Sequence, residues 1–196
     1  MSKRRNSTRD SSTTPQQVRI IAGRWKGRKL PVVQKDDVRP TPNRVRETLF
    51  NWLQGNIQGS HCLDLFAGSG ALGFESASRE ASLVTVVDND HAVIELLKKQ
   101  IELFDASKIN LVCDDGIKYL SKTEQKFDII YLDPPFSKFD LNQLLAQLEN
   151  VKILKPQALV YVESPPDELP QNLPSGWQWW RQSKASQVAF GLIATS

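Results

Sequence analysis

The chain is poor in the residues that cross-link small proteins or bind metals. Only two of its 196 residues are cysteines, Cys62 and Cys113, and only two are histidines, His61 and His91. No CxxC pair or zinc-type Cys/His spacing occurs, so we expect no metal site. Both cysteines lie in apolar runs. This predicts that they are reduced, buried packing residues in a reducing compartment.

Long apolar runs are also missing. No segment approaches the roughly 20 apolar residues that span a bilayer, and residues 1–17 lack the apolar stretch of a secretory signal. We therefore expect a cytoplasmic monomer with no membrane partner. With 40% hydrophobic and 24% charged residues, the composition is that of an ordinary globular protein. We expect a disordered basic tail over residues 1–17, a small extension over 18–54 and the main domain over 55–196.

Positive charge is concentrated at the start of the chain. The net charge is only +3, but residues 1–48 hold 13 Lys and Arg against 4 Asp and Glu. A basic arm before a mildly acidic body is typical of a protein that meets a polyanion along one edge. For the first few charges alone, a solubilising tail is an equally good interpretation. The later ones alternate with apolar residues, which favours a folded basic surface that contacts nucleic acid.

Apolar periodicity predicts an α/β protein. Runs at 18–22 and 29–33 indicate a β-hairpin, and a helix follows to about residue 53, with Thr41 as its N-cap and Pro42 at its first position. Five apolar strands then alternate with helices, which indicates a mostly parallel sheet covered on both faces. They are predicted at 61–65, 83–87, 109–113, 127–132 and 158–162. Only four residues separate the last two runs, 177–182 and 187–194, so these must form an antiparallel hairpin.

Each of the first four parallel strands ends in a carboxylate, at Asp64, Asp88, Asp114/Asp115 and Asp133. In an open α/β sheet, ligands bind outside the carboxyl ends of the strands. Four acids gathered there without a ligand rich in hydrogen-bond donors would repel one another. Polar residues simply marking strand ends would explain any one of them, but not all four together with the adjacent glycine turn.

The glycine turn is the segment DLFAGSG at residues 64–70, between the first strand and a helix. Its spacing to Gly73 matches GxGxxG, a dinucleotide pattern, yet Asp64 would place an anion beside a pyrophosphate. Asp64 is better suited to a ligand with an ammonium group. Asp88 can accept hydrogen bonds from ribose hydroxyls, and Asp115 can accept one from an adenine amino group. A ligand that has these three groups and no phosphate is S-adenosylmethionine. The residues predicted to bind it are Thr41, Arg46, Asp64, Phe66, Ala67, Gly68, Ser69, Gly70, Asp88, Asn89, Asp115 and Gly116.

The segment DPPF at residues 133–136 resembles the (N/D)PP(Y/F) signature of enzymes that methylate exocyclic amines, and its chemistry suits the activation of such an amine. Such an amine is a weak nucleophile because its lone pair is delocalised into the base. The Asp133 carboxylate and the Pro134 carbonyl can accept its hydrogens and stabilise the positive charge that develops on nitrogen. Pro135 helps to stiffen the turn, and Phe136 offers a face on which a flipped base stacks. A strand stop with a buried Phe is the weaker alternative.

Together these segments resemble a known family. The glycine turn with Asp88 is similar to class I methyltransferases with a Rossmann-like sheet, and DPPF is similar to their amine-methylating signature. The N-terminal GRWKGR, at residues 23–28, and RPTPNRVRE, at residues 39–47, narrow the match. From residue 18 onwards the chain resembles the RsmD family, which methylates guanine N2 in 16S ribosomal RNA. Many relatives have Glu where this chain has Asp88.

The resemblance implies a ribosomal RNA substrate, presented on the small ribosomal subunit or its assembly intermediate. The side chains predicted to contact the RNA are Arg24, Lys26, Arg28, Arg39, Arg44 and Phe136. Three alternatives remain open at this point. They are a DNA adenine-N6 methyltransferase, a non-catalytic RNA-binding assembly factor that retains the fold, and a small-molecule methyltransferase.

Overall fold

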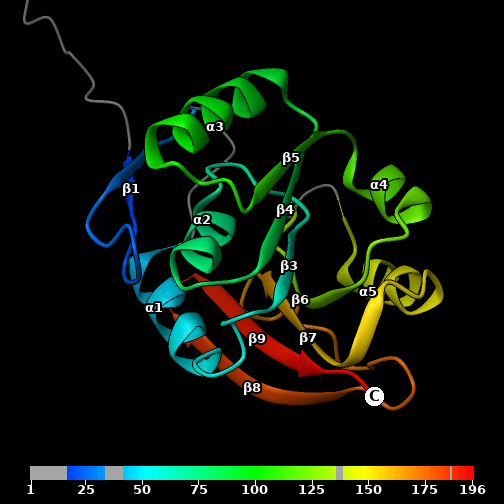
Figure 1. The fold of residues 1–196 in the computed structure, drawn as a ribbon. Coiled ribbons are helices and arrows are strands. Elements are labelled where there is room, and N and C mark those ends of the chain that lie inside the picture. Colours follow the sequence, from blue (N-terminus) through cyan, green and yellow to red (C-terminus); the bar gives the residue numbers. More distant parts are fainter. Residues whose placement is uncertain (1–16, 34–41, 136–138, 186) are drawn as a thin grey trace, which may run out of the picture.

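The computed structural model describes residues 17–33, 42–135, 139–185 and 187–196. Its main feature is a seven-stranded sheet in the order β5-β4-β3-β6-β7-β9-β8 (Figure 1). The strands are β3 (His61–Asp64), β4 (Leu83–Asp88), β5 (Ile109–Cys113), β6 (Phe127–Leu132), β7 (Leu154–Ser164), β8 (Gln178–Ala185) and β9 (Val188–Ala194). The first five are parallel, and β9 runs antiparallel to β7 and β8. The predicted α/β sheet with a closing antiparallel hairpin is confirmed.

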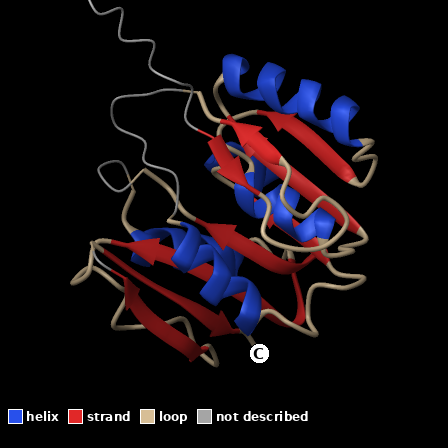
Figure 2. Ribbon diagram, turned by 90° about the vertical axis from the view of Figure 1, so that its left-hand side faces the viewer, coloured by secondary structure: helices blue, strands red, loops and turns tan. Residues whose placement is uncertain are grey.

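Helices cover both faces of this sheet (Figure 2). Alternate strand residues point to opposite faces, so Cys62 and Tyr131 belong to one core cluster while Leu63 and Leu132 belong to the other. The helices are α1 (Asn43–Trp52), α2 (Ala71–Ser78), α3 (His91–Phe104), α4 (Gly116–Lys122) and α5 (Leu141–Asn150). Helices α1, α2 and α3 contribute to the first cluster, and α4 and α5 to the second. No helix in the described ranges is long and apolar enough to cross a membrane.

The strand order creates a switch point between β3 and β6. The chain builds outward from β3 to β4 and β5, then returns to place β6 on the other side of β3. The helices that follow β3 and β6 therefore lie on opposite faces and leave a crevice at the carboxyl ends of these two strands. Asp64 ends β3 and Asp133 directly follows β6, so the fold brings both acids to this crevice.

The N-terminal extension packs onto the main domain through α2. It consists of the hairpin β1 (Gln17–Arg19) and β2 (Lys29–Pro31), followed by α1. Glu75 of α2 is fully buried and accepts the backbone N–H groups of Ile21 and Ala22 at 2.7 and 3.0 Å. Trp25 contacts Phe74, with ring centroids 6.3 Å apart. The extension thus shares a core with the sheet.

Ser78, the last residue of α2, is a second attachment point. Its carbonyl accepts the N–H of Arg24 at 2.8 Å, and its hydroxyl accepts the N–H of Trp25 at 3.0 Å. Gly23 adopts φ +80°, and a Cβ there would lie 1.9 Å from the Ser78 carbonyl oxygen. Only glycine therefore allows the hairpin to approach α2 this closely.

Several details differ from the sequence predictions. Helix α1 begins at Asn43, and Pro42 occupies the cap position, where its carbonyl accepts the N–H of Val45 at 2.9 Å. The prediction of Thr41 as the cap was wrong, because the extended ψ of Pro42 (143°) places it before the helix. Cys113 is exposed, because it ends the edge strand β5, whereas Cys62 is buried as predicted. Strand β7 is also longer than the predicted 158–162. The tail predicted at residues 1–17 lies outside the described residues, except for Gln17.

Candidate active site

The glycine turn connects β3 to α2 at the switch point. Gly68 and Gly70 have φ angles of +50° and +69°, and Gly70 is the N-cap of α2. This left-handed conformation favours glycine and turns the chain sharply into the helix. The backbone of the turn consequently lies at the crevice, where a ligand can approach it closely.

Asp64 is buried beneath this turn. Only 3% of the residue is exposed, and its Oδ2 accepts the N–H of Gly73 at 2.9 Å. Burial raises the pKa of Asp64 to about 7. The hydrogen bond from Gly73 opposes this rise, and the negative charges of Asp133 and Asp88 add to it. Such a carboxylate gains from a neighbouring cation, because the cation would offset its desolvation.

Asp88, at the end of β4, supports the turn from the other side. Its Oδ2 accepts the N–H of Gly68 at 2.8 Å, and its Oδ1 accepts the N–H of Asp90 at 2.9 Å. Each carboxylate oxygen can accept more than one hydrogen bond, so both remain available to ribose hydroxyls. Asn89, which follows, is exposed. The bond to Gly68 was not predicted, although the 20-residue spacing had suggested a ribose contact.

The end of β5 forms the outer part of the crevice. Asp115 is the N-cap of α4 and accepts the N–H of Lys118 at 3.0 Å. Asp114 pairs with Lys122, whose hydrogen bond lowers the pKa of this carboxyl group. Gly116 lies so close to the β3 exit that a Cβ would meet the carbonyl of Leu65 at 3.0 Å. The structure therefore places Asp115 and Gly116 beside the turn.

Asp133, Pro134 and Pro135 leave β6 at the same edge. Asp133 is half-buried and Pro134 buried, while Pro135 is exposed. The charge of Asp133 acts on both Asp64 and Tyr161 and raises the pKa of each, after the larger effect of burial. The acid of the fourth parallel strand is thus electrostatically linked to Asp64, the acid of the first. Phe136 lies outside the described residues.

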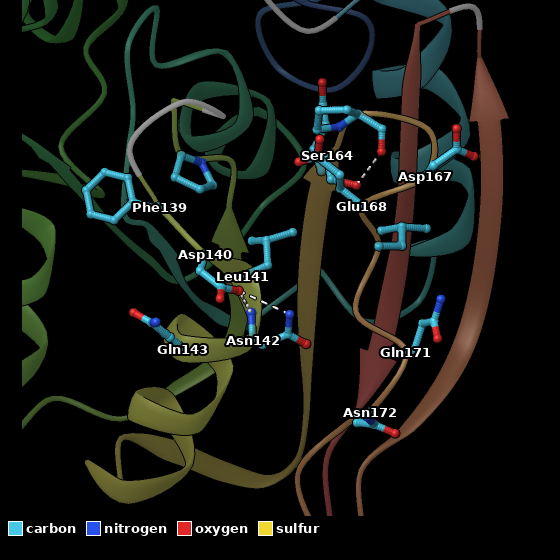
Figure 3. Close-up of a pocket in the computed structure, with 14 residues that line it drawn as sticks. Phe139, Asp140, Leu141, Asn142, Gln143, Ser164, Asp167, Glu168, Gln171 and Asn172 are labelled. Carbon is cyan, nitrogen blue, oxygen red and sulfur yellow. Dashed lines mark hydrogen bonds between the residues drawn. The ribbon is translucent and has the colours of Figure 1, made fainter.

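A groove of about 980 Å³ opens next to Pro134 (Figure 3). Phe139 and the first turn of α5 line one side, and the segment that follows β7 lines the other. The carboxylates of Asp140, Glu163, Asp167 and Glu168 line it, and none of the lining residues that the structure describes is a Lys or Arg. This groove was not predicted from the sequence, because only the fold brings residues 163–172 opposite the β6 exit. The one indication in the sequence is Glu163, an acid directly after the predicted fifth strand, 158–162; in the structure it lies near the end of β7.

The predicted basic residues occupy different environments. Arg46 is 1% exposed, and its Nη2 donates to the Arg19 carbonyl and the Asn43 Oδ1 at 2.9 and 2.7 Å, while burial lowers its pKa. These contacts join β1 to α1, and a cofactor contact by Arg46 stays a prediction. Arg44 is exposed. Arg39 and Thr41 lie outside the described residues.

The hairpin residues Arg24 and Arg28 have partners within the protein. Arg24 forms an exposed ion pair with Asp105 at 3.4 Å, and the Arg28 guanidinium lies 3.8 Å from the ring centroid of Phe104. Lys26 is exposed and lies with Asn43 beside a small hollow between the hairpin and α1. We call Lys26 and Arg44 the hairpin–helix cations. Both side chains are exposed, and neither forms an ion pair with another residue in the described ranges.

The crevice has the features needed for a cationic nucleoside. The glycine turn leaves room for close backbone approach, Asp88 offers acceptors to hydroxyl groups, and the buried Asp64 favours a positive charge. These acids would repel a pyrophosphate. Fold and site together define the chain as a Rossmann-like protein of the methyltransferase class.

Comparison with known proteins identifies the family. A profile described as "Conserved hypothetical protein 95" matches residues 18–194. Ribosomal RNA small subunit methyltransferase D of Escherichia coli is 42% identical over 176 residues, which cover 90% of this chain and 89% of the relative. A solved structure from Escherichia coli, provisionally named a methyltransferase, covers 92% of this chain and 99% of its own, with TM-score 0.83 and 40% identity. The chain belongs to this family, which confirms the resemblance to the RsmD methyltransferases.

A more distant structure supports the fold assignment. It is provisionally named a methyltransferase and is in complex with SAH. With 19% identity and TM-score 0.65, it covers 85% of this chain and 53% of its own. At this identity the likeness concerns the fold alone.

Proposed function

We propose that this protein transfers a methyl group from S-adenosylmethionine to the N2 amine of a guanine in 16S ribosomal RNA, on the assembling small ribosomal subunit in the cytoplasm. The main support is the placement of Asp133 and Pro134 at the switch point, beside the buried Asp64. The name of the 42% identical relative supports ribosomal RNA as the substrate. We further propose that residues 18–54 are an extension of a methyltransferase domain formed by residues 55–196.

The proposed mechanism depends on orientation and electrostatics. When bound, S-adenosylmethionine supplies an electrophilic methyl group on a sulfonium centre. Asp64 and Asp88 would hold the amino and ribose ends of that ligand, while the Asp133 carboxylate and the Pro134 carbonyl would accept the hydrogens of the target amine. The nitrogen lone pair then points along the line of transfer, and Asp133 stabilises the charge that develops on nitrogen. The proton leaves afterwards, to Asp133 or water.

Methyl transfer assays distinguish this function from the alternatives. The protein is incubated with methyl-labelled cofactor and either small subunits from cells that lack this protein, the corresponding naked RNA, or DNA. We expect label in subunit RNA and, after digestion and mass mapping, N2-methylguanine at one position. Label in DNA adenine would support the DNA methyltransferase. Absence of cofactor binding would support a non-catalytic factor.

The pKa of Asp64 predicts that cofactor binding releases protons. At pH 7 a carboxyl group with a pKa of about 7 is half protonated, and a bound ammonium group favours the ionised form. Cofactor affinity is therefore expected to rise with pH up to about 7 and then level off. Calorimetry in two buffers of different ionisation enthalpy at pH 7 is expected to show release of about half a proton per cofactor.

The Asp64→Asn variant is the control for this measurement. Its amide oxygen can still accept the Gly73 N–H, but the side chain has no proton to release. We expect the buffer dependence to disappear together with part of the affinity. If the variant releases as many protons as the wild type, the titrating group lies elsewhere.

The hairpin–helix cations are expected to contribute to RNA binding. The double variant Lys26→Gln/Arg44→Gln is expected to weaken binding to small subunits about tenfold. It is also expected to lower the slope of log affinity against log salt by between about 1 and 2, as for the loss of two phosphate contacts. The matched control is Lys126→Gln/Lys152→Gln, which removes two exposed charges near the amino end of β6. Equal salt slopes for the two variants would contradict this surface.

A further inference from the structure

We propose that Glu163 selects guanine over other bases by accepting the N1–H of the target base. This inference rests on the proposed function, since it assigns a recognition role within the same site. It adds a specificity residue to the cofactor acids and the DPPF segment.

The sheet register places Glu163 next to Asp133. Strands β6 and β7 are parallel, and Leu132 pairs with Val162 at the end of their ladder. Asp133 and Glu163 are the next residues on the two strands. Partners in a parallel pair point to the same face, so the two side chains are neighbours on the face that also holds Tyr131 and Tyr161. Glu163 and Pro134 also line the same groove.

Glu163 is held firmly in this position. Only 4% of the residue is exposed, and its Oε2 accepts the Tyr161 hydroxyl at 2.7 Å. Tyr161 is itself fully buried, and burial together with the charges of Glu163 and Asp133 raises its pKa, so it remains a donor at neutral pH. Each carboxylate oxygen has two lone pairs, so such a group can accept several hydrogen bonds at once, and a buried carboxylate gains from each additional donor.

The chemistry of the bases explains why a second carboxylate would favour guanine. In guanine the N2 amine is adjacent to N1–H, so the base edge presents donors side by side. In adenine and cytosine the ring nitrogen next to the amine carries a lone pair instead. If Asp133 and the Pro134 carbonyl accept the amine hydrogens, a neighbouring carboxylate accepts N1–H of guanine but repels the ring nitrogen of the other two. A site built around such a bond strongly rejects analogues that lack the donor.

The test uses a base that keeps the N2 amine and lacks N1–H, namely 2,6-diaminopurine. Small subunits are reconstituted with 16S RNA that carries either guanine or 2,6-diaminopurine at the mapped target. The wild-type protein is expected to methylate guanine with a kcat/KM at least about 100-fold higher. For Glu163→Gln we expect this ratio to fall below about tenfold, because the Gln amide can present either its oxygen to N1–H or its N–H to a bare N1. Its rate on guanine is expected to fall as well.

Two further variants make the outcome specific. Glu168→Gln removes a carboxylate from the same groove at an exposed position and is expected to keep the full ratio. Glu163→Asp retains a carboxylate and is expected to keep the preference for guanine over 2,6-diaminopurine at a lower rate. If Glu163→Gln does not fold, Glu163→Asp provides the test of the proposal in its place. Cofactor affinity and melting temperature report whether each variant is folded.

The possible failures are distinguishable. A wild-type protein that does not methylate guanine N2 overturns the proposed function, and the role of Glu163 with it. A wild-type protein that methylates guanine and 2,6-diaminopurine equally overturns only the role of Glu163. So does a Glu163→Gln variant that keeps the 100-fold ratio, or a Glu168→Gln variant that loses it.

Discussion

Replacing Asp133 with alanine is expected to lower kcat about 1,000-fold while cofactor affinity changes by no more than several-fold. The carboxylate lies at the β6 exit, on the substrate side of the crevice, whereas the turn and the acids that would hold the cofactor follow β3, β4 and β5. Its loss removes the acceptor that orients the amine and stabilises its developing charge. The rate of methyl transfer is measured by single-turnover assays on small subunits, and the cofactor affinity is measured by calorimetry.

Asp167→Ala is the matched control for Asp133→Ala. It removes a carboxylate from the same groove, at an exposed position that forms a loose ion pair with Lys184. We expect nearly wild-type turnover. If Asp133→Ala instead abolishes cofactor binding with its fold intact, Asp133 belongs to the cofactor site and the assignment of the amine site is wrong.

Gly23→Ala is expected to destabilise the protein by at least about 3 kcal/mol, and Gly27→Ala by only about 1 kcal/mol. Both glycines have similar left-handed φ angles, +80° and +83°. A Cβ at Gly27 meets nothing within 4 Å, whereas a Cβ at Gly23 would overlap the Ser78 carbonyl oxygen. The difference between the variants therefore isolates the cost of moving the hairpin away from α2.

Urea unfolding of the two glycine variants measures this difference. Loss of the hairpin contacts in Gly23→Ala is also expected to expose Trp25, which is buried at 5% relative exposure, so its fluorescence is expected to shift to longer wavelength. Equal stabilities would mean that the hairpin adjusts its position without cost.

Most of the sheet was predictable because its signals are local. A parallel strand covered on both faces is apolar throughout, and its end is marked by the first charged residue, as at Asp64 and Asp88. The acidic crevice could be predicted for the same reason, since parallel strands all end at one edge of the sheet.

The remaining features depend on contacts between distant segments. Glu75 lies on a helix that the sequence predicted, but its bonds to Ile21 and Ala22 join residues more than 50 positions apart. The groove beside Pro134 likewise needs the segment after β7 to fold back towards α5. Cys113 was misplaced because apolar neighbours do not reveal that β5 is an edge strand.

Helix α2 has a mechanical consequence for the proposed enzyme. Its first end is the glycine turn at Gly70, and its last residue, Ser78, is the attachment point of the hairpin. Eight helical residues form a stiff rod about 12 Å long. If RNA binding displaced the hairpin, this rod would carry the displacement to the turn. Thermodynamic reciprocity would then require any change in cofactor affinity to be matched by an equal change in RNA affinity.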